Sequence, residues 1–113
     1  MACNACETGF QSSMSIVPSI TRSGTNAYLY VANQGRNIAL ISRILLCVSN
    51  AGGGSSVFYL RYPGPITWTY SSSTLEPGTT ALFYTLTGVA ATSIVQAQAE
   101  YIEIDGRARS CAG

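Results

Sequence analysis

Residues 28–48, YLYVANQGRNIALISRILLCV, decide the fold of this 113-residue chain. Aromatic and aliphatic side chains fill residues 28–32, and a longer apolar run fills residues 38–48. Between them stands an Asn-x-Gly tripeptide at 33–35, which carries two residue types that favour turns. Two such runs separated by a turn are typical of neighbouring β-strands, so this stretch predicts two strands of a β-rich domain.

The same pattern continues along the rest of the chain, where period-two alternation recurs and helical periodicity is almost absent. Turn formers stand at 23–24, 34–35, 52–54, 63–65, 77–78 and 88. The strands expected between them cover residues 13–20, 27–33, 38–49, 55–62, 66–72, 80–87 and 93–105. This spacing predicts an all-β chain that forms a single immunoglobulin-like or jelly-roll β-sandwich of about seven strands. The domain spans 1–113, with a cysteine-bearing arm at 1–12 and a tail at 106–113.

Alternation also predicts which residues share a face of each strand. In the third strand one side carries Ile38, Leu40, Ile44, Leu46 and Val48, interrupted only by Ser42. In the last strand one side carries Val95, Ala97, Ala99 and Tyr101. The apolar phase then changes to Ile102 and Ile104, which predicts a β-bulge or a crossing between sheets at that point. Pro18 cannot donate to a central ladder, so the first strand is expected at an edge or a bulge.

The charge composition excludes several classes of function. Charged residues make up 10% of the chain, against about 25% in an ordinary soluble domain. With a net charge of +1, no basic stripe exists to bind nucleic acid. There is no apolar run long enough to span a membrane and no visible signal peptide. Few carboxylates predict a stability that changes little with pH, which suits an extracellular setting or a surface buried against copies of itself.

The four cysteines allow three interpretations. They are Cys3, Cys6, Cys47 and Cys111. A zinc site would need all four thiolates, because the chain has no histidine. A redox C-x-x-C motif needs a helix start that residues 1–6 do not offer. Two disulfides that join the N-terminal pair to Cys47 and Cys111 would close long loops, each worth roughly 3–4 kcal/mol. We favour the disulfides, which indicate an oxidising compartment or a hyperthermophilic source.

Catalytic arrangements are scarce. The absence of histidine excludes Ser-His-Asp and Cys-His sites. The clustered carboxylates are Glu100, Glu103 and Asp105. Glu100 and Glu103 differ by an odd number along a strand and should point to opposite faces, so we interpret them as solvated groups that pair with arginines such as Arg107 or Arg109. Gly52-Gly53-Gly54 lacks a following Lys-Ser/Thr and is read as a hairpin connection. We therefore expect neither an enzyme nor a cofactor.

A family resemblance covers residues 28–107. The stretch at 28–48 is followed by LEPGTTALFYTLTG at 75–88 and EYIEIDGR at 100–107. This order resembles the immunoglobulin-like β-sandwich of archaeal surface-filament proteins, namely archaellum accessory proteins and archaeal pilins. The chain departs from those families in lacking their N-terminal hydrophobic helix. In its low charge and its cysteines it is similar to small all-β virion proteins of archaeal viruses.

These observations predict a non-enzymatic structural protein, a subunit of a virion or of an extracellular surface appendage, with an archaeal origin implied by the resemblance. It would associate with copies of itself or with other subunits of the same assembly, because low-charge edge strands can pair with a neighbour. The candidate interface residues are Phe10, Met14, Ile16, Tyr59, Tyr62 and Tyr70. The alternative is a sugar-binding or adhesion module that uses the aromatic face beside Trp68, although Trp68 itself is expected in the core.

Overall fold

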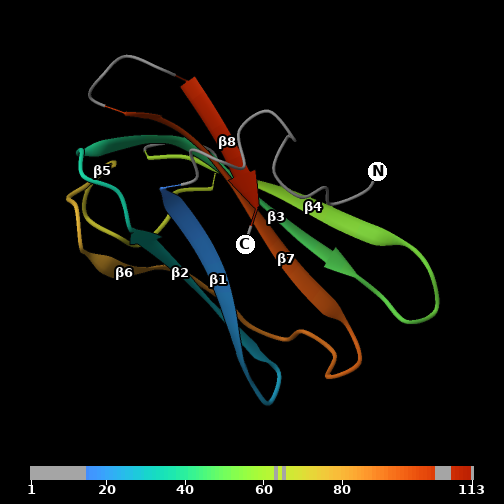
Figure 1. Ribbon diagram of the computed structural model, residues 1–113. Coiled ribbons are helices and arrows are strands. Elements are labelled where there is room, and N and C mark those ends of the chain that lie inside the picture. Colours follow the sequence, from blue (N-terminus) through green and yellow to red (C-terminus); the bar gives the residue numbers. More distant parts are fainter. Residues whose placement is uncertain (1–14, 63, 65, 104–107, 113) are drawn as a thin grey trace.

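Figure 1 shows the computed structural model, which describes residues 15–62, 64, 66–103 and, for the backbone alone in the last five, 108–112. The described residues form eight strands and no helix. The strands are β1 (Ile16–Ser23), β2 (Asn26–Asn33), β3 (Ala39–Ser49), β4 (Ser55–Leu60), β5 (Thr74–Leu75), β6 (Thr80–Leu86), β7 (Ile94–Glu103) and β8 (Ala108–Ala112). The predicted all-β class is confirmed.

The strands form two antiparallel sheets. One has the order β1-β2-β6, and the other has the order β4-β3-β7-β8, with β5 paired to the same strand β3. In chain order these are the places of strands A, B and E and of strands C′, C, F and G in an immunoglobulin-like sandwich. Of the two predicted architectures, the structure therefore has the immunoglobulin-like one. β1 is an edge strand, as Pro18 predicted.

The core lies between the sheets and is built around aromatic side chains. The largest fully buried side chains include Trp68, Phe83 and Tyr101, each at most 1% exposed. The Trp68 ring packs on Phe83 with 5.2 Å between ring centroids, and its indole N–H donates to the carbonyl of Ser72 at 2.9 Å. Trp68 is thus a core residue, as the sequence predicted. Burying one such ring contributes about 3 kcal/mol.

A β-bulge on β3 corrects the predicted faces. Ile41 pairs with Tyr101 and Arg43 pairs with Glu100, so Ser42 is an extra residue on β3. The buried side consequently changes phase, from Ile41 before the bulge to Ile44 after it. Our expectation that Ile38 and Leu40 share the core face of Ile44 was wrong, since these two side chains are 40% and 43% exposed.

For the last strand the sequence predicted a change of the buried phase, and the structure has none there. Alternation along β7 continues without a slip through Tyr101 to Glu103, both buried, while Ile102 is 37% exposed. The predicted phase change at Ile102 was therefore wrong within the described residues, and Ile104 lies outside them. Leu40 and Ile102 are register partners across β3 and β7. Leu40 on β3 and Ile102 on β7 are therefore apolar side chains on the outer face. In each strand the sequence pattern led us to assign them to the core face.

Residues 66–72 do not form the predicted strand. They belong to a loop that holds only an isolated bridge between Arg61 and Thr67, and the next strand is the two-residue β5. Burial still alternates here, because Trp68 is buried between exposed Thr67 and Thr69. The loop is held to the bulge of β6: the backbone N–H and the hydroxyl of Thr69 both donate to the carbonyl of Phe83, at 2.7 and 2.9 Å.

The Asn-x-Gly turn joins the two sheets through the Asn33 side chain. This side chain is buried, and its Nδ2 donates to the carbonyls of Asn37 and Leu75 at 2.8 and 2.9 Å. Its Oδ1 accepts from the N–H of Gly35 at 2.9 Å. A Cβ on Gly35 would lie 2.6 Å from the Cβ of Ser15. Asparagine and glycine are therefore required here by hydrogen bonding and by close approach.

Candidate interaction site at the β4 edge

β4 forms the edge of the larger sheet. It pairs with β3 on one side, and no described strand pairs with its other side. Natural edge strands are usually guarded by charged residues, by proline or by a bulge. The β4 sequence, SSVFYL, contains no charged residue and no proline, and its register with β3 is continuous. No described strand covers the outer side of residues 56–60, so another strand could pair there.

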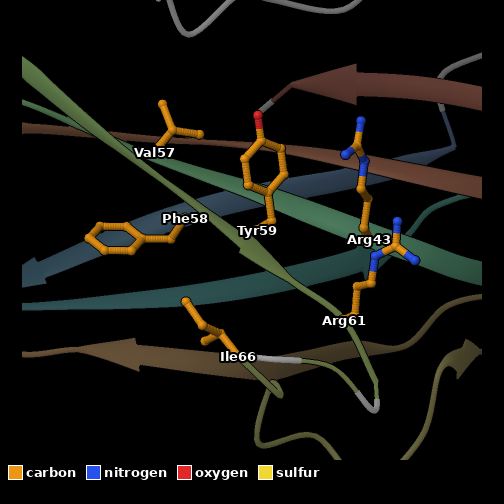
Figure 2. Close-up of a pocket in the computed structure, with 6 residues that line it drawn as sticks. All are labelled: Arg43, Val57, Phe58, Tyr59, Arg61 and Ile66. Carbon is orange, nitrogen blue, oxygen red and sulfur yellow. The ribbon is translucent and has the colours of Figure 1, made fainter.

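The side chains of β4 alternate between the two faces of the sheet. Leu60 is fully buried and pairs with Ile44, and half-buried Phe58 pairs with Leu46, so both project into the sandwich. Tyr59 lies on the outer face and is 43% exposed. Figure 2 shows Val57 and Tyr59 on one side of the strand and Phe58 on the other. An added strand would therefore meet side chains on both faces.

A pocket of about 410 Å³ lies at this edge. Its lining consists of apolar or aromatic side chains and two arginines: Arg43, Val57, Phe58, Tyr59, Arg61 and Ile66. The arginines come from opposed positions, since Arg43 precedes Ile44, Arg61 follows Leu60, and Ile44 and Leu60 are register partners. Figure 2 shows both guanidinium groups at one end of the site.

The two arginines differ in their environment. Nη2 of Arg43 lies 2.8 Å from Oε2 of Glu100, and its Cζ lies 5.1 Å from the centre of the Tyr59 ring. The hydrogen bond that Arg43 donates to Glu100 raises the pKa of Arg43 and keeps the guanidinium charged. The Arg61 side chain is exposed and has no hydrogen-bond or ion-pair partner among the described residues. Arg61 is consequently the positive group that an approaching ligand would meet.

A second pocket of about 290 Å³ lies farther along the same side of the sandwich. Phe58 lines both pockets, and the second is completed by Val48 of β3, Leu86 of β6 and the residues that follow β6. The loop before β7 is held there by Arg22, whose Nη1 and Nη2 donate to the carbonyls of Ser93 and Ala90 at 2.8 and 3.1 Å. The β4 side of the sandwich is thus hollowed on both sides of Phe58.

The three tyrosines proposed as interface residues have different contacts. Tyr59 lines the pocket, whereas Tyr62 stacks on Trp68 with 6.0 Å between centroids and Tyr70 stacks on Phe83 at 4.6 Å. The Tyr62 and Tyr70 rings each pack on a buried aromatic ring, and Tyr62 is still 41% exposed, so the sugar-binding alternative stays a prediction.

The remaining interface candidates come from the N-terminal part. Ile16 is fully buried in the core cluster, which removes it from the surface candidates. The reason is that Ile16 belongs to β1 and faces the other sheet. Phe10 and Met14 lie outside the described residues. The sequence-based interpretation missed Arg43, Arg61 and Phe58, which the β3–β4 register brings to one place.

The cysteines are described only in part. Cys47 is 2% exposed although it lies on the outer face of β3, opposite in phase to Leu46. It is disulfide-bonded, and its partner lies outside the described side chains. Cys3 and Cys6 lie outside the described residues, and Cys111 is described only by its backbone in β8. The pairing of the four cysteines stays a prediction.

The carboxylates on β7 point to opposite faces, as predicted. Glu100 pairs with Arg43 on the outer face. Glu103 is 9% exposed and accepts a hydrogen bond from the Ser15 hydroxyl, so its interpretation as a solvated group was wrong. It is buried because alternation along β7 continues past Ile102.

The other predicted groups near the C-terminus lie outside the description: Asp105, and the side chains of Arg107 and Arg109. Among the residues that are described, no group of three or more His, Cys, Asp or Glu is placed to hold a metal ion. The described part of the chain also contains no helix long and apolar enough to cross a membrane.

Comparison with solved structures found similar chains. The X-ray structure of a Northeast Structural Genomics Consortium target has a TM-score of 0.64 and 17% sequence identity, with 87% of this chain and 81% of that chain covered. The archaellum periplasmic stator protein complex FlaF and FlaG from Sulfolobus acidocaldarius has a TM-score of 0.49 and 13% identity, with 100% of both chains covered. FlaG from the same organism has a TM-score of 0.44 and 17% identity, with 87% of this chain and 97% of that chain covered.

The expected resemblance to archaeal surface-filament proteins is therefore met among solved structures. At 17% identity, the likeness to the Northeast Structural Genomics Consortium target concerns the fold alone. The resemblance to virion proteins stays a prediction. No protein-family model matches the chain, and no curated protein matches it in sequence.

Proposed function

We propose that this protein is a non-enzymatic structural subunit of an extracellular assembly, either an archaeal surface appendage or a virion, that binds neighbouring subunits through the β4 edge. The appendage setting follows the archaellum stator proteins named above, which form a complex. The observation that carries the proposal belongs to this chain: next to two pockets, β4 has an outer side that contains no charged residue and that no described strand covers.

The physical basis is strand addition. Backbone groups along an open edge gain partners when another strand docks, and the alternate side chains of that strand enter neighbouring pockets. The groove walls contributed by Val57, Phe58 and Ile66 are apolar. Among the described residues of this lining, Arg43 and Arg61 are the charged ones, so few of these charged groups would lose water on docking.

The disulfide framework supports an oxidising, extracellular compartment as part of the proposal. Cys111 pairs with Ala99 on β7, and Ala99 pairs with Ile44 on β3. Cys47 therefore lies two strands away from Cys111, about 10 Å, and three residues farther along β3, about another 10 Å. Disulfide-bonded Cα atoms are usually 4.4–6.8 Å apart. This geometry favours Cys3 or Cys6 as the partner of Cys47.

Peptide mapping of the unreduced protein tests the disulfide part of the proposal. We expect a peptide containing Cys47 to be linked to one containing Cys3 or Cys6. Four thiols that react with an alkylating reagent in the denatured, unreduced protein would contradict it, and so would a Cys47–Cys111 link. Zinc that is retained on purification would support the four-thiolate alternative instead.

Light scattering of the oxidised, full-length protein tests the assembly role. We expect mass to increase with concentration, and we expect Val57→Lys to prevent the increase, since an edge lysine opposes strand pairing. Thr21→Lys is the matched control, because Thr21 is an exposed residue on the β1 edge strand. A protein that stays monomeric at high concentration, or a mass increase that Val57→Lys leaves unchanged, would contradict self-association through β4.

A further inference from the structure

We propose that the N-terminal arm of this chain, residues 3–14, lies across the outer face of the larger sheet and is fastened there by the disulfide of Cys47. The inference rests on the disulfide part of the proposed function and does not depend on the assembly role. It follows from the places on this face where described residues have partners, and from the length of chain that precedes Ser15.

Three described residues with interaction partners lie on one diagonal of the outer face. They are Gln98 on β7, Cys47 on β3 and Ser55 on β4. Gln98 pairs with Leu45, two residues before Cys47. Ser55 pairs with Ser49, two residues after Cys47. Each step along the diagonal thus crosses one strand and two residues, which makes the line about 16 Å long. One extended segment of about five residues would follow it.

The described strands leave this face without a second layer. They form two sheets that pack through a common core, and Cys47 lies on the opposite side of β3 from the core residue Leu46. Cys47 is nevertheless 2% exposed, and it is disulfide-bonded to a residue outside the described side chains. The bonded residue therefore covers Cys47 from the solvent side.

Of the segments outside the described residues, the N-terminal arm is the one that can reach Ser55. Residues 63 and 65 adjoin the opposite end of β4, about 17 Å along the strand. Residues 104–107 adjoin the end of β7 that pairs with the start of β3, about 30 Å away. β8 and the residue that follows it lie three strands, about 14 Å, from β4.

The arm is long enough for this path, provided that it is extended. The described chain begins at Ser15, whose hydroxyl donates to Glu103. Glu103 stands seven residues along β7 from Gln96, the register partner of Cys47, which is about 23 Å. The two N-terminal cysteines stand nine and twelve residues before Ser15, and such lengths span at most about 30 and 40 Å.

The anchor is one disulfide between Cys47 and an N-terminal cysteine. It forms when two thiols give two electrons and two protons to an oxidant such as the disulfide of a thiol–disulfide oxidoreductase. A dithiol reductant reverses the step and restores both thiols. Because the arm also reaches Ser55, it guards that end of the β4 edge. Pairing of another strand with β4 is then confined to residues 56–60.

Site-specific photo-cross-linking of the full-length, oxidised protein tests the inference, at a concentration where light scattering finds a monomer. The photoreactive residue p-benzoylphenylalanine replaces Gln96, which is exposed beside Cys47. In the matched control it replaces Leu82, which is exposed on β6 in the other sheet. Peptide mass spectrometry locates the cross-link, and a denaturing gel shows whether it joins one chain or two.

We expect the residue at position 96 to link, within one chain, to a peptide from residues 3–14, and we expect the control at position 82 to give no such link. Dithiothreitol should lower the yield at position 96, because the released arm moves away from the face. Emission of the buried Trp68 checks that the reduced protein stays folded. If it unfolds, the double variant Cys3→Ser/Cys6→Ser replaces the reduced protein in the same measurement.

Three outcomes overturn the inference. They are no link from position 96 to residues 3–14, a covalent dimer, which would place the arm on a second copy, and a yield that release of the arm does not lower. Association in light scattering without the link would leave the assembly role intact. A link at position 96 in a protein that never associates would contradict the assembly role and support the inference. The two failures are therefore distinguishable.

Discussion

The side of the sandwich where β1 meets β7 is closed by hydrogen bonds, whereas the side bordered by β4 is open. On the closed side the backbone N–H of Ser15 donates to the Tyr101 hydroxyl at 3.3 Å, and the Ser15 hydroxyl donates to Glu103. The N–H of Gln34 donates to the Ser15 carbonyl at 2.7 Å. On the open side the half-buried ring of Phe58 lies between two pockets.

This difference indicates that the closed side contributes mainly to the stability of the fold and the open side mainly to binding. Buried polar groups that lose a partner cost far more than a paired group contributes, so the closed side should tolerate substitution poorly. The open side contains exposed or half-buried residues whose loss leaves few buried groups unsatisfied. Substitutions there should change binding much more than they change the free energy of unfolding.

The largest effect is expected for Asn33→Ala on the closed side. The change removes the side-chain partners of the Asn37 and Leu75 carbonyls and of the Gly35 N–H. We expect a loss of about 3 kcal/mol in the free energy of unfolding, measured by urea denaturation. Asn37→Ala, an exposed position in the same turn, is the control and should cost little. A similar loss for both variants would contradict the role assigned to the Asn33 side chain.

A somewhat smaller effect is expected for Gly35→Ala. The new Cβ would lie 2.6 Å from the Ser15 Cβ, and overpacking of this kind costs about 1–3 kcal/mol. Gly52→Ala has open space around it and should be nearly neutral. The double variant with Ser15→Gly tests the cause, because it removes the atom that collides. Thermal unfolding measures the stability of all three variants. If the double variant is no more stable than the sum of the two single changes predicts, the collision with Ser15 is not the cause.

Much of the fold could be predicted from the sequence because local patterns specify it. The two runs at 28–48 form β2 and β3, Trp68 is buried, and Pro18 lies on an edge strand. The bulge was misplaced because β3 is apolar on both faces before Ser42, so hydrophobicity does not reveal which phase is buried. Residues 66–72 alternate like a strand, yet pairing depends on distant partners that alternation does not specify.

The candidate site was predictable only in outline. An unguarded edge and the contribution of Tyr59 could be inferred from a low-charge strand. Arg43 and Arg61 stand 18 positions apart in the sequence, and only the β3–β4 register brings them together. The clearest available signal was an arginine within one apolar run and another at the end of the next, where a charged side chain must reach an edge or an ion-pair partner.

On the open side, Phe58→Ala should cost about 1 kcal/mol, less than a fully buried phenylalanine would, because the ring is only half-buried. Its larger effect should be on docking, since Phe58 lines both pockets. We expect urea denaturation to show the modest loss and light scattering to show clearly weaker association. A loss above 3 kcal/mol would place Phe58 with the core and would blur the contrast between the two sides.

The smallest effect is expected for the Arg43–Glu100 pair, whose side chains are 33% and 35% exposed. Exposed ion pairs contribute between 0 and about 1 kcal/mol, so Arg43→Ala and Glu100→Gln should each change the free energy of unfolding by less than that. Because the hydrogen bond that Arg43 donates to Glu100 raises the pKa of Arg43, the contribution of this guanidinium is complete below the ordinary pKa of arginine. It is lost only as the pH rises through the raised value.

Denaturation of the wild type and of Arg43→Ala between neutral pH and about pH 10 should therefore give a constant difference between the two proteins. Added salt should reduce that difference, since the pair is partly exposed to solvent. A difference that disappears below pH 10 would show that the ionisation of another group controls this region. A difference above about 2 kcal/mol would mean that the open side contributes to stability as the closed side does, and the contrast drawn between them would fail.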